Sequence, residues 1–247
     1  QESLTPPPSP VILDRYDRPL RFFLASDEQW RFYTSLQEID PDMVKALIAY
    51  EDQWFYFHPG VNPFSLLRAL FQNYRAKEIV SGGSTLTMQL ARMLEPKPRT
   101  YKSKIIEILR AIQLEFRFSK QELLTFYFNL APYGGNIQGI ATASWFYFRK
   151  APDRLSPAGI ALLVSLPQSP EERRPDLHPA SAKKGRDRVL LRLLQKGLIS
   201  EEEYQRAIQT EVPAKRKDLP MIAPHLAEML KNRAGSNGKV VSTIDRE

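Results

Sequence analysis

Signals that start a helix recur along most of this chain, and they constrain its fold more than any other feature. In three places a side chain that can cap a helix precedes a proline, which fits the first helical turn. In two others a serine precedes a glutamate by three residues, the spacing of a capping box. These starts are at Asp40-Pro41, Asn62-Pro63, Ser119 with Glu122, Ser156-Pro157 and Ser200 with Glu203. The sequence therefore predicts a mainly α-helical chain.

β-Structure is expected only near the two ends. Residues 11–26 are typical of two short strands around a polar turn, and "KVVSTI" near the C-terminus has a β-like pattern. The helical segments between them are predicted over 41–55, 64–77, 84–94, 101–118, 121–130, 138–148, 158–166, 180–196 and the stretch after Ser200, with one short helix in the tail. The chain has no internal repeat.

Composition narrows the classes of partner. Lys and Arg number 35 against 28 Asp and Glu, a net charge of +7, which favours nucleic acid, lipid headgroups or a phosphate-bearing substrate. The chain has no cysteine, which excludes disulfides and Cys-based zinc sites, and its 3 histidines are scattered. No apolar run is long enough to span a membrane. The start at Gln1 lacks signal-peptide features, and the missing methionine favours a targeting segment that precedes it.

The stretch "EDQWFYFHPG" at 51–60 is the first candidate for chemistry. It puts an acidic pair, several aromatics and a histidine where a helical pattern gives way to a turn. A carboxylate walled by aromatics is partly desolvated, and such a group can act as a general base. A surface acid beside core aromatics is the alternative, and the stretch alone does not choose between them.

A second stretch, "SGGSTLTMQLAR", suits an anion. Two glycines lead into Ser84 and Thr85 at a helix start, where unbonded N–H groups and the helix dipole favour phosphate. It is not a P-loop, because no Lys-Ser/Thr follows at the required spacing. A glycine turn with a serine cap is the alternative. The cations that follow strengthen the anion hypothesis: Arg92, Lys97, Arg99, Lys102 and Lys104.

Two further stretches remain ambiguous by themselves. On the helical period Glu107 lies one turn from Lys104, which usually means a surface salt bridge. The segment "FYFNLAPYGGNIQGIATASWFYFRK" combines glycine and aromatics. That mixture is typical of close helix packing or of a wall on which sugars stack.

Taken in order, these elements resemble the peptidoglycan glycosyltransferases, glycosyltransferase family 51. "GGSTLTMQ" is similar to the family's GGST-x-T-x-Q motif, "SKIIE" to its RK-x2-E, the segment 119–150 to its long fourth motif and "ALLVSLPQSP" to its fifth. The first stretch agrees with the signature ED-x2-F-x2-H-x-G at Glu51, Asp52, Phe55, His58 and Gly60. "APHLAEMLK" and "VVSTID" resemble the linker that enters the transpeptidase domain of class A penicillin-binding proteins, and the motifs are most similar to the 1c type.

The sequence departs from the family at two positions. Met88 stands where the family has Gln, and Ser103 where it has Arg. Arg99 and Lys102 are close enough in sequence to supply the missing positive charge. The serine nucleophile motif of the transpeptidase domain is absent, so no penicillin binding is expected of these 247 residues.

The resemblance implies a reaction and roles. Glu51 would take the proton from the 4-hydroxyl of a GlcNAc on lipid II, whose oxygen attacks C1 of the MurNAc that ends a lipid-linked glycan. Undecaprenyl pyrophosphate leaves and a β-1,4 linkage forms by inversion. Glu107 would be the second essential carboxylate, and it would orient cations or a divalent metal (Mg²⁺ or Mn²⁺) on the pyrophosphate. The residues expected to bind substrate and pyrophosphate are Asp52, Phe55, His58, Ser84, Thr85, Gln89, Arg92, Arg99 and Lys104.

The resemblance also predicts the organisation. We expect an extended linker at 1–10 after a missing membrane anchor, a β-containing lead-in at 11–40, a lysozyme-like helical glycosyltransferase domain at 41–210, and at 211–247 the start of a linker towards an absent transpeptidase domain. The helix over 62–74 is interpreted as a membrane-facing jaw, with a buried core helix as the alternative. The expected location is the periplasmic face of the bacterial inner membrane, with lipid II, the lipid-linked glycan and anionic lipid as partners and no nucleic acid.

Two other functions remain open. A muramidase-type hydrolase would share the fold and the glutamate but use water as acceptor, and it would not need the cations at 92–104. A non-catalytic basic module that binds anionic lipid or nucleic acid would need the charge but not the motifs. A Glu51→Gln substitution would abolish turnover in either enzyme and leave binding by such a module intact.

Overall fold

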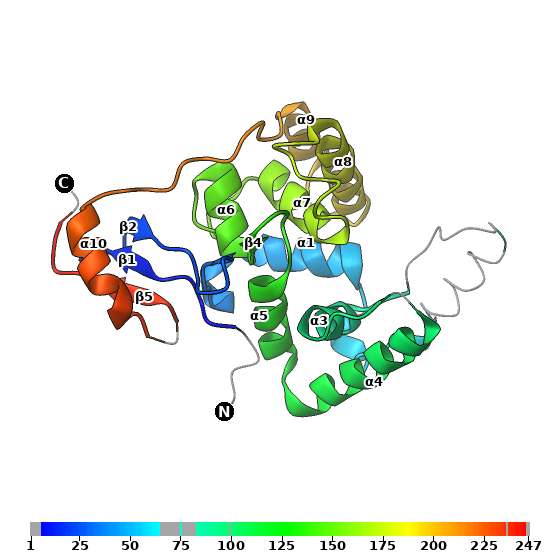
Figure 1. Ribbon diagram of the computed structural model, residues 1–247. Helices are drawn as coiled ribbons and strands as arrows, with labels where there is room; N and C mark the ends of the chain where they lie inside the picture. Colours follow the sequence, from blue (N-terminus) through cyan, green and yellow to red (C-terminus); the bar gives the residue numbers. More distant parts are fainter. Residues whose placement is uncertain (1–5, 65–74, 76–82, 99, 236, 246–247) are drawn as a thin grey trace. The chain divides into compact units, whose positions relative to one another are not determined.

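The computed structural model describes residues 6–64, 75, 83–98, 100–235 and 237–245, and Figure 1 shows its elements. The chain divides into two compact units. The larger comprises Gln1–Ala46 with Phe128–Glu247, and the smaller comprises Leu47–Tyr127. The divisions fall within the helices α1 (Pro41–Glu51) and α5 (Lys120–Leu130).

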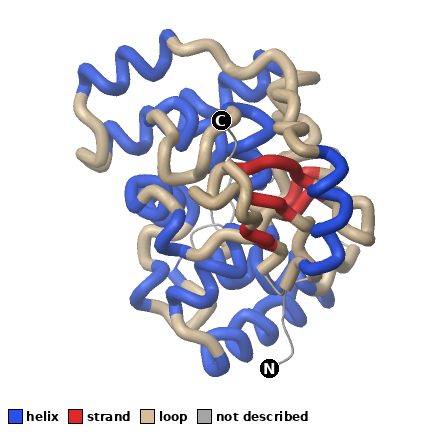
Figure 2. The backbone as a smooth tube through the Cα atoms, turned by 90° about the vertical axis from the view of Figure 1, so that its left-hand side faces the viewer, coloured by secondary structure: helices blue, strands red, loops and turns tan. Residues whose placement is uncertain are grey.

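Three short strands of the larger unit form a sheet in the order β2-β1-β5. β1 (Val11–Leu13) pairs antiparallel with β2 (Pro19–Phe22) and parallel with β5 (Lys239–Val241). Ile12, Leu20 and Ala227 form a buried cluster that packs the sheet against α10 (Pro224–Leu230). The lead-in and the tail of the chain therefore build one sheet, whose strands are among the red segments in Figure 2.

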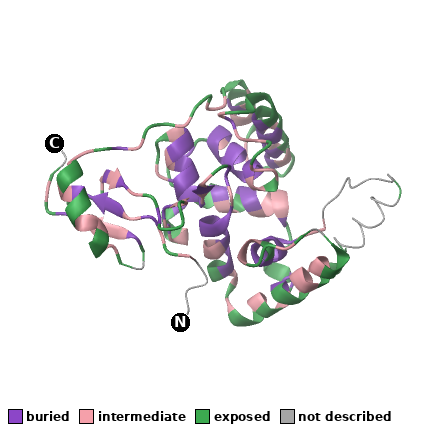
Figure 3. Cartoon of the chain, viewed as in Figure 1, coloured by how far each residue is buried: buried purple, intermediate pink, exposed green. Residues whose placement is uncertain are grey.

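Four helices supply a large part of the core of the larger unit: α6 (Ile140–Phe148), α7 (Pro157–Ser165), α8 (Pro179–Gln195) and α9 (Glu201–Gln209). α7 consists of small and apolar residues and is buried from its second residue to its last, as its purple colour in Figure 3 shows. α8 and α9 both pack against α7. A helix that is apolar on all sides is stable only when neighbours cover it, so α7 lies at the centre of this unit.

The smaller unit contains the end of α1, α3 (Leu86–Leu94), α4 (Tyr101–Arg117) and the start of α5. α3 packs against α4. Each of these two helices has a threonine N-cap, Thr85 and Thr100, whose hydroxyl accepts a backbone N–H from the first turn. The first six residues of α3, 86–91, are all buried.

The mainly α-helical fold is confirmed, and most helix starts agree with the predicted ones. α1 ends at Glu51 rather than near Phe55, because the chain turns through a 3₁₀ segment at Phe55–Phe57. α3 is capped by Thr85 rather than Ser84. The helix predicted over 64–77 lies almost wholly outside the described residues, and Arg99 lies outside them as well. The interpretation of that helix as a membrane-facing jaw therefore also concerns residues outside the described part of the chain.

Candidate active site

Glu51, the predicted base, is the last residue of α1 and is partly buried. Gln89 of α3 donates from Nε2 to Glu51 Oε2 at 2.8 Å. The hydroxyl of Tyr127 in α5 donates in turn to Gln89 Oε1 at 3.2 Å. Both Gln89 and Tyr127 are buried, at 8% and 2% exposure. The carboxylate is therefore held by a buried amide that has its own buried partner.

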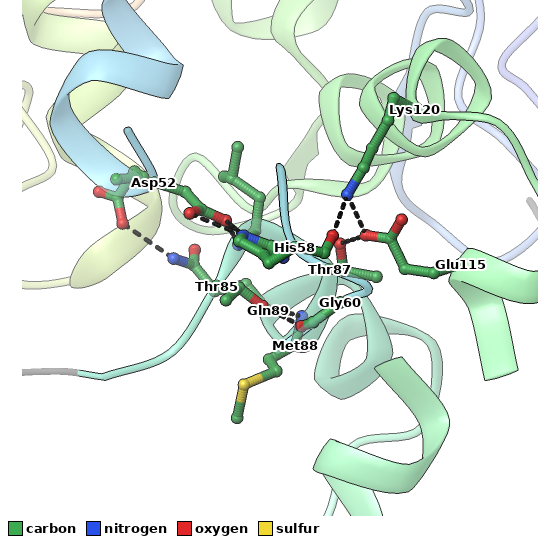
Figure 4. Close-up of polar contacts among 11 residues, drawn as sticks. Asp52, His58, Gly60, Thr85, Thr87, Met88, Gln89, Glu115 and Lys120 are labelled. Atoms are coloured by element: carbon green, nitrogen blue, oxygen red, sulfur yellow. Dashed lines mark hydrogen bonds and ion pairs between the residues drawn. The ribbon is translucent and has the colours of Figure 1, made fainter. Parts of the chain in front are cut away.

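Asp52 connects the end of α1 to the start of α3. It is 7% exposed, and its carboxylate accepts the backbone N–H of Leu86 at 3.0 Å, which satisfies one of the unbonded N–H groups at the helix N-terminus. His58 Nε2 lies 2.9 and 3.0 Å from the two carboxylate oxygens. Since a carboxylate only accepts, Nε2 carries the proton. Figure 4 shows this pair beside α3. These bonds join the end of α1, the turn at His58 and the start of α3, so Asp52 and His58 have a structural role.

The threonine and glycine of the two motifs bind each other. Thr85 Oγ1 accepts the N–H of Met88 at 3.1 Å and donates to the carbonyl of Gly60 at 2.5 Å. Gly60 has a φ of +88°, and a Cβ there would lie 2.7 Å from the carbonyl oxygen of Ala111. Only glycine fits such a position. The last residue of the first motif is thus fixed by close approach to α4.

An ion pair between Lys120 and Glu115, which the sequence analysis missed, contacts the first motif. Lys120 Nζ is 2.8 Å from Glu115 Oε1 and donates to the carbonyl of His58 at 2.8 Å. It also lies 4.5 Å from the centre of the buried ring of Phe55. Thr87 Oγ1 donates to Glu115 Oε1 at 2.6 Å (Figure 4). The available signal was an acid and a lysine on either side of the break between α4 and α5.

Lys104 brings two predicted site residues together. Its Nζ donates to Ser84 Oγ at 2.6 Å and to Glu107 Oε1 at 2.6 Å. Glu107 is largely buried, with its side chain 10% exposed. Ser103, which replaces the family's arginine, bonds from its backbone N–H to the cap Thr100 at 3.1 Å. An ammonium beside a hydroxyl at a helix start suits an anionic oxygen.

The other predicted cations differ in their surroundings. Arg92 is exposed in the last turn of α3. Lys97 pairs with Glu95 at 2.6 Å, and Arg110 lies 3.2 Å from the same carboxylate. The hydrogen bond from Lys97 lowers the pKa of Glu95. Lys97 is therefore already neutralised locally, while Arg99 lies outside the described residues.

The described His, Asp and Glu side chains do not form a site that would hold a metal ion without the substrate. In the described part of the chain, no three His, Asp or Glu side chains are grouped closely enough to bind an ion. The carboxylate of Glu107 already faces the Lys104 ammonium at 2.6 Å. A divalent cation on the pyrophosphate would have to take its oxygen ligands mainly from the substrate.

The smaller unit also exposes apolar surface, of which the sequence analysis singled out the aromatics of 51–60 and Phe64 at the start of the expected jaw but not the residues of α4. A pocket of about 820 Å³ is lined by Trp54, Phe57, His58, Pro59, Val61, Asn62, Pro63, Phe64 and Ile112. Along α4, large apolar side chains are exposed at helical spacing: Tyr101, Ile105, Leu109 and Phe116. Together with Trp54, Phe57 and Phe64 they form what we call the apolar face. Among the described residues, no helix is long and apolar enough to cross a bilayer.

Comparison with known proteins decides the family. Residues 18–194 match the family model described as Transglycosylase, which covers well over half of the chain. The chain belongs to the transglycosylase family. The resemblance of the motifs is thereby confirmed. The matched residues contain the whole smaller unit and parts of the larger one.

Relatives of this transglycosylase chain include penicillin-binding proteins. Penicillin-binding protein 1C of Escherichia coli K12 is 41% identical over 238 residues, which are 96% of this chain and 31% of that protein. Penicillin-binding protein 1A of Aquifex aeolicus is 36% identical over 99% of this chain and 35% of its own length. A crystal structure of penicillin-binding protein 1A from Haemophilus influenzae matches 98% of this chain and 28% of that one, with a TM-score of 0.49 and 19% identity. The chain thus spans about a third of the length of each of these two relatives.

Most predicted site residues of the transglycosylase chain meet in the smaller unit in two clusters. One contains Glu51 and Gln89. Beside it the first two motifs are joined by the bonds from Leu86 N–H to Asp52, which also contacts His58, and from Thr85 to the Gly60 carbonyl. The other contains Ser84, Lys104 and Glu107. Glu115, Lys120 and Tyr127 were not predicted. Tyr127 contacts the predicted Gln89, Lys120 contacts the carbonyl of the predicted His58, and Glu115 pairs with Lys120.

Proposed function

We propose that this chain polymerises peptidoglycan glycan strands, transferring a lipid-linked glycan onto lipid II. Family membership supports the reaction class, and the carboxylate at the end of α1 carries the proposal within it. That carboxylate is half-buried, faces a fixed amide donor at 2.8 Å and belongs to the same unit as the Ser84, Lys104 and Glu107 cluster. A base and a separate source of positive charge, here Lys104, are what this displacement requires.

In the proposed step, Glu51 takes the proton of the acceptor 4-hydroxyl as its oxygen bonds to C1 of the donor MurNAc. The bond from C1 to the pyrophosphate oxygen breaks on the opposite face, which inverts the anomeric centre. Lys104 and Arg92 offset the charge that develops on the leaving pyrophosphate, and Glu107 orients Lys104. A pyrophosphate leaves readily, so no strong acid is needed on that side.

We place the reaction at the outer face of the bacterial inner membrane, where lipid-linked substrates reside. The apolar face supports contact with lipid, because its rings include Phe57, Phe64 and Phe116 at 80%, 84% and 85% exposure. The net charge of +7 would add attraction to anionic headgroups. In a full-length penicillin-binding protein of this kind, its own transpeptidase domain would be a further partner.

The test is polymerisation of labelled lipid II in detergent by the 247-residue chain, with products resolved on a gel. We expect a ladder of glycan strands that moenomycin suppresses and that Glu51→Gln reduces by at least about 10²-fold. Glu202→Gln is the matched control, since that side chain is 82% exposed in α9 of the larger unit.

Two results would contradict the proposal. A chain that binds lipid II without forming a ladder would not be the polymerase described here. Release of reducing ends from preformed cell wall, with no ladder, would instead identify a hydrolase that uses water as acceptor.

A further inference from the structure

We infer that Tyr127 is a positioning residue for the base: it acts through Gln89 and fixes the orientation of the Glu51 carboxylate. This inference rests on the proposed function. It starts from the three-residue chain already described, in which the Tyr127 hydroxyl donates to Gln89 Oε1 and Gln89 Nε2 donates to Glu51 Oε2. The three side chains come from α5, α3 and α1.

The last side-chain torsions of Glu51 and Gln89 explain why a third residue matters. Rotation of a glutamate carboxylate or a glutamine carboxamide about its last bond is soft, so neither group fixes its own plane. The two ends of the amide have nearly the same shape, and only their partners decide which end faces Glu51. Tyr127 has a rigid ring that is 2% exposed, and its hydroxyl supplies the donor that the amide oxygen requires.

The reaction itself makes this orientation vulnerable. Once Glu51 has taken the proton, its neutral carboxyl group can donate, and an amide turned by 180° would then accept from it. With Oε1 engaged by Tyr127, Gln89 keeps its Nε2–H directed at Glu51 Oε2 before and after the transfer. Because Gln89 is 8% exposed, water is a poor substitute for the tyrosine hydroxyl.

Tyr127→Phe removes the hydroxyl and keeps the ring. We expect kcat for lipid II polymerisation to fall about fivefold, the cost of one buried hydrogen bond expressed as a rate, while KM stays within about twofold. Tyr147→Phe is the matched control, since Tyr147 is also fully buried and its hydroxyl donates to the carbonyl of Tyr133 at 2.8 Å, in the larger unit. It should lower Tm to a similar extent and leave kcat unchanged.

A double-mutant cycle separates positioning from general loosening of the fold. In a Gln89→Leu background, adding Tyr127→Phe should change kcat by less than about 1.5-fold, because the group through which Tyr127 acts is gone. An undiminished fivefold effect in that background would overturn the inference. So would equal losses of kcat in the Tyr127→Phe and Tyr147→Phe chains.

The unsubstituted chain and Glu51→Gln run in the same assay. Polymerisation that requires Glu51 but ignores Tyr127 would remove this inference alone. No polymerisation by the unsubstituted chain would remove the proposed function and the inference with it.

Discussion

Gly60 shows how a motif residue can be fixed by space alone. Its φ of +88° and the carbonyl of Ala111, 2.7 Å from where a Cβ would lie, leave no room for a side chain. The Thr85 hydroxyl bonds to its carbonyl, so a shift of Gly60 also disturbs the cap of α3. At the scale of single residues, the first motif is therefore largely a set of packing constraints around one carboxylate, the proposed base Glu51.

We predict that Gly60→Ala lowers the free energy of unfolding by roughly 2 kcal/mol or more. Gly197→Ala is the control, because Gly197 also has a positive φ, +67°, but nothing within 4 Å. It should cost only about 1 kcal/mol. Urea titration of both variants measures the difference, and equal losses would mean that backbone strain rather than the close contact decides the effect.

Asp14 is a titratable residue beside the sheet of the larger unit. Burial raises the pKa of Asp14, but hydrogen bonds from Arg18 and from the backbone of Tyr16 outweigh it and lower that pKa to about 2. The side chain of Asp14 is fully buried beside β1, and Arg18 Nε lies 2.6 Å from its Oδ2. The folded state therefore favours the ionised carboxylate.

This predicts acid sensitivity with a definite sign. Because the folded pKa lies below the ordinary value of 3.8, the stabilisation is complete above about pH 4 and is lost as the pH falls through about 2. Thermal unfolding at several pH values should show Tm falling over this range. Asp14→Asn should lower Tm at neutral pH and reduce the further loss in acid, and an unchanged acid slope would contradict the assignment.

At the scale of elements, the two threonine caps are matched in type and differ in their surroundings. Thr100 accepts the N–H of Ser103 at 3.1 Å near solvent. Thr85 is 2% exposed, accepts the N–H of Met88 and also donates to Gly60. The start of α3 thus depends on its cap for two buried hydrogen bonds, whereas α4 does not.

We predict that Thr100→Ala costs about 1 kcal/mol of unfolding free energy and Thr85→Ala about 2 kcal/mol. The larger loss includes the hydrogen bond to the Gly60 carbonyl. Chemical denaturation of both variants measures the two losses of unfolding free energy, which can be compared directly when the m-values are equal. If the two substitutions cost the same, the bond from Thr85 to Gly60 contributes nothing to stability.

Local signals explain which elements were predictable. Ser156-Pro157 and the capping box at Ser200 predicted their helices because a cap and its helix are adjacent in sequence. The pairing of β1 with β5 and the bond from Asp52 to the N–H of Leu86 depend on residues brought together only by folding. The same holds for Tyr127 and Lys120, whose roles required their partners' positions to be known.

At the scale of the whole molecule, the apolar feature relevant to a membrane can be assigned to named residues, while the charge is known as a net value of +7. The apolar face belongs to the smaller unit, where it combines the α4 stripe with the rings around the pocket. Exposed apolar surface of this extent is a mark of an interaction site.

We predict that Phe116→Ser weakens binding to liposomes of anionic lipid by about tenfold and hardly changes Tm, because the ring is 85% exposed. Leu191→Ser, exposed by 44% on α8 of the larger unit, should leave binding unchanged. Liposome co-sedimentation measures both. Equal effects of the two substitutions would mean that the apolar face is not the contact surface.

The bonds that Asp52 makes to His58 and Leu86 have a consequence for how members of this family are recognised in genomes. A descendant chain that lost Glu51 would still need Asp52, His58 and Gly60 to fold. It would retain nearly the whole signature and be counted among the enzymes. Under the function proposed above, a chain without Glu51 would be inactive and would still match the signature at Asp52, Phe55, His58 and Gly60.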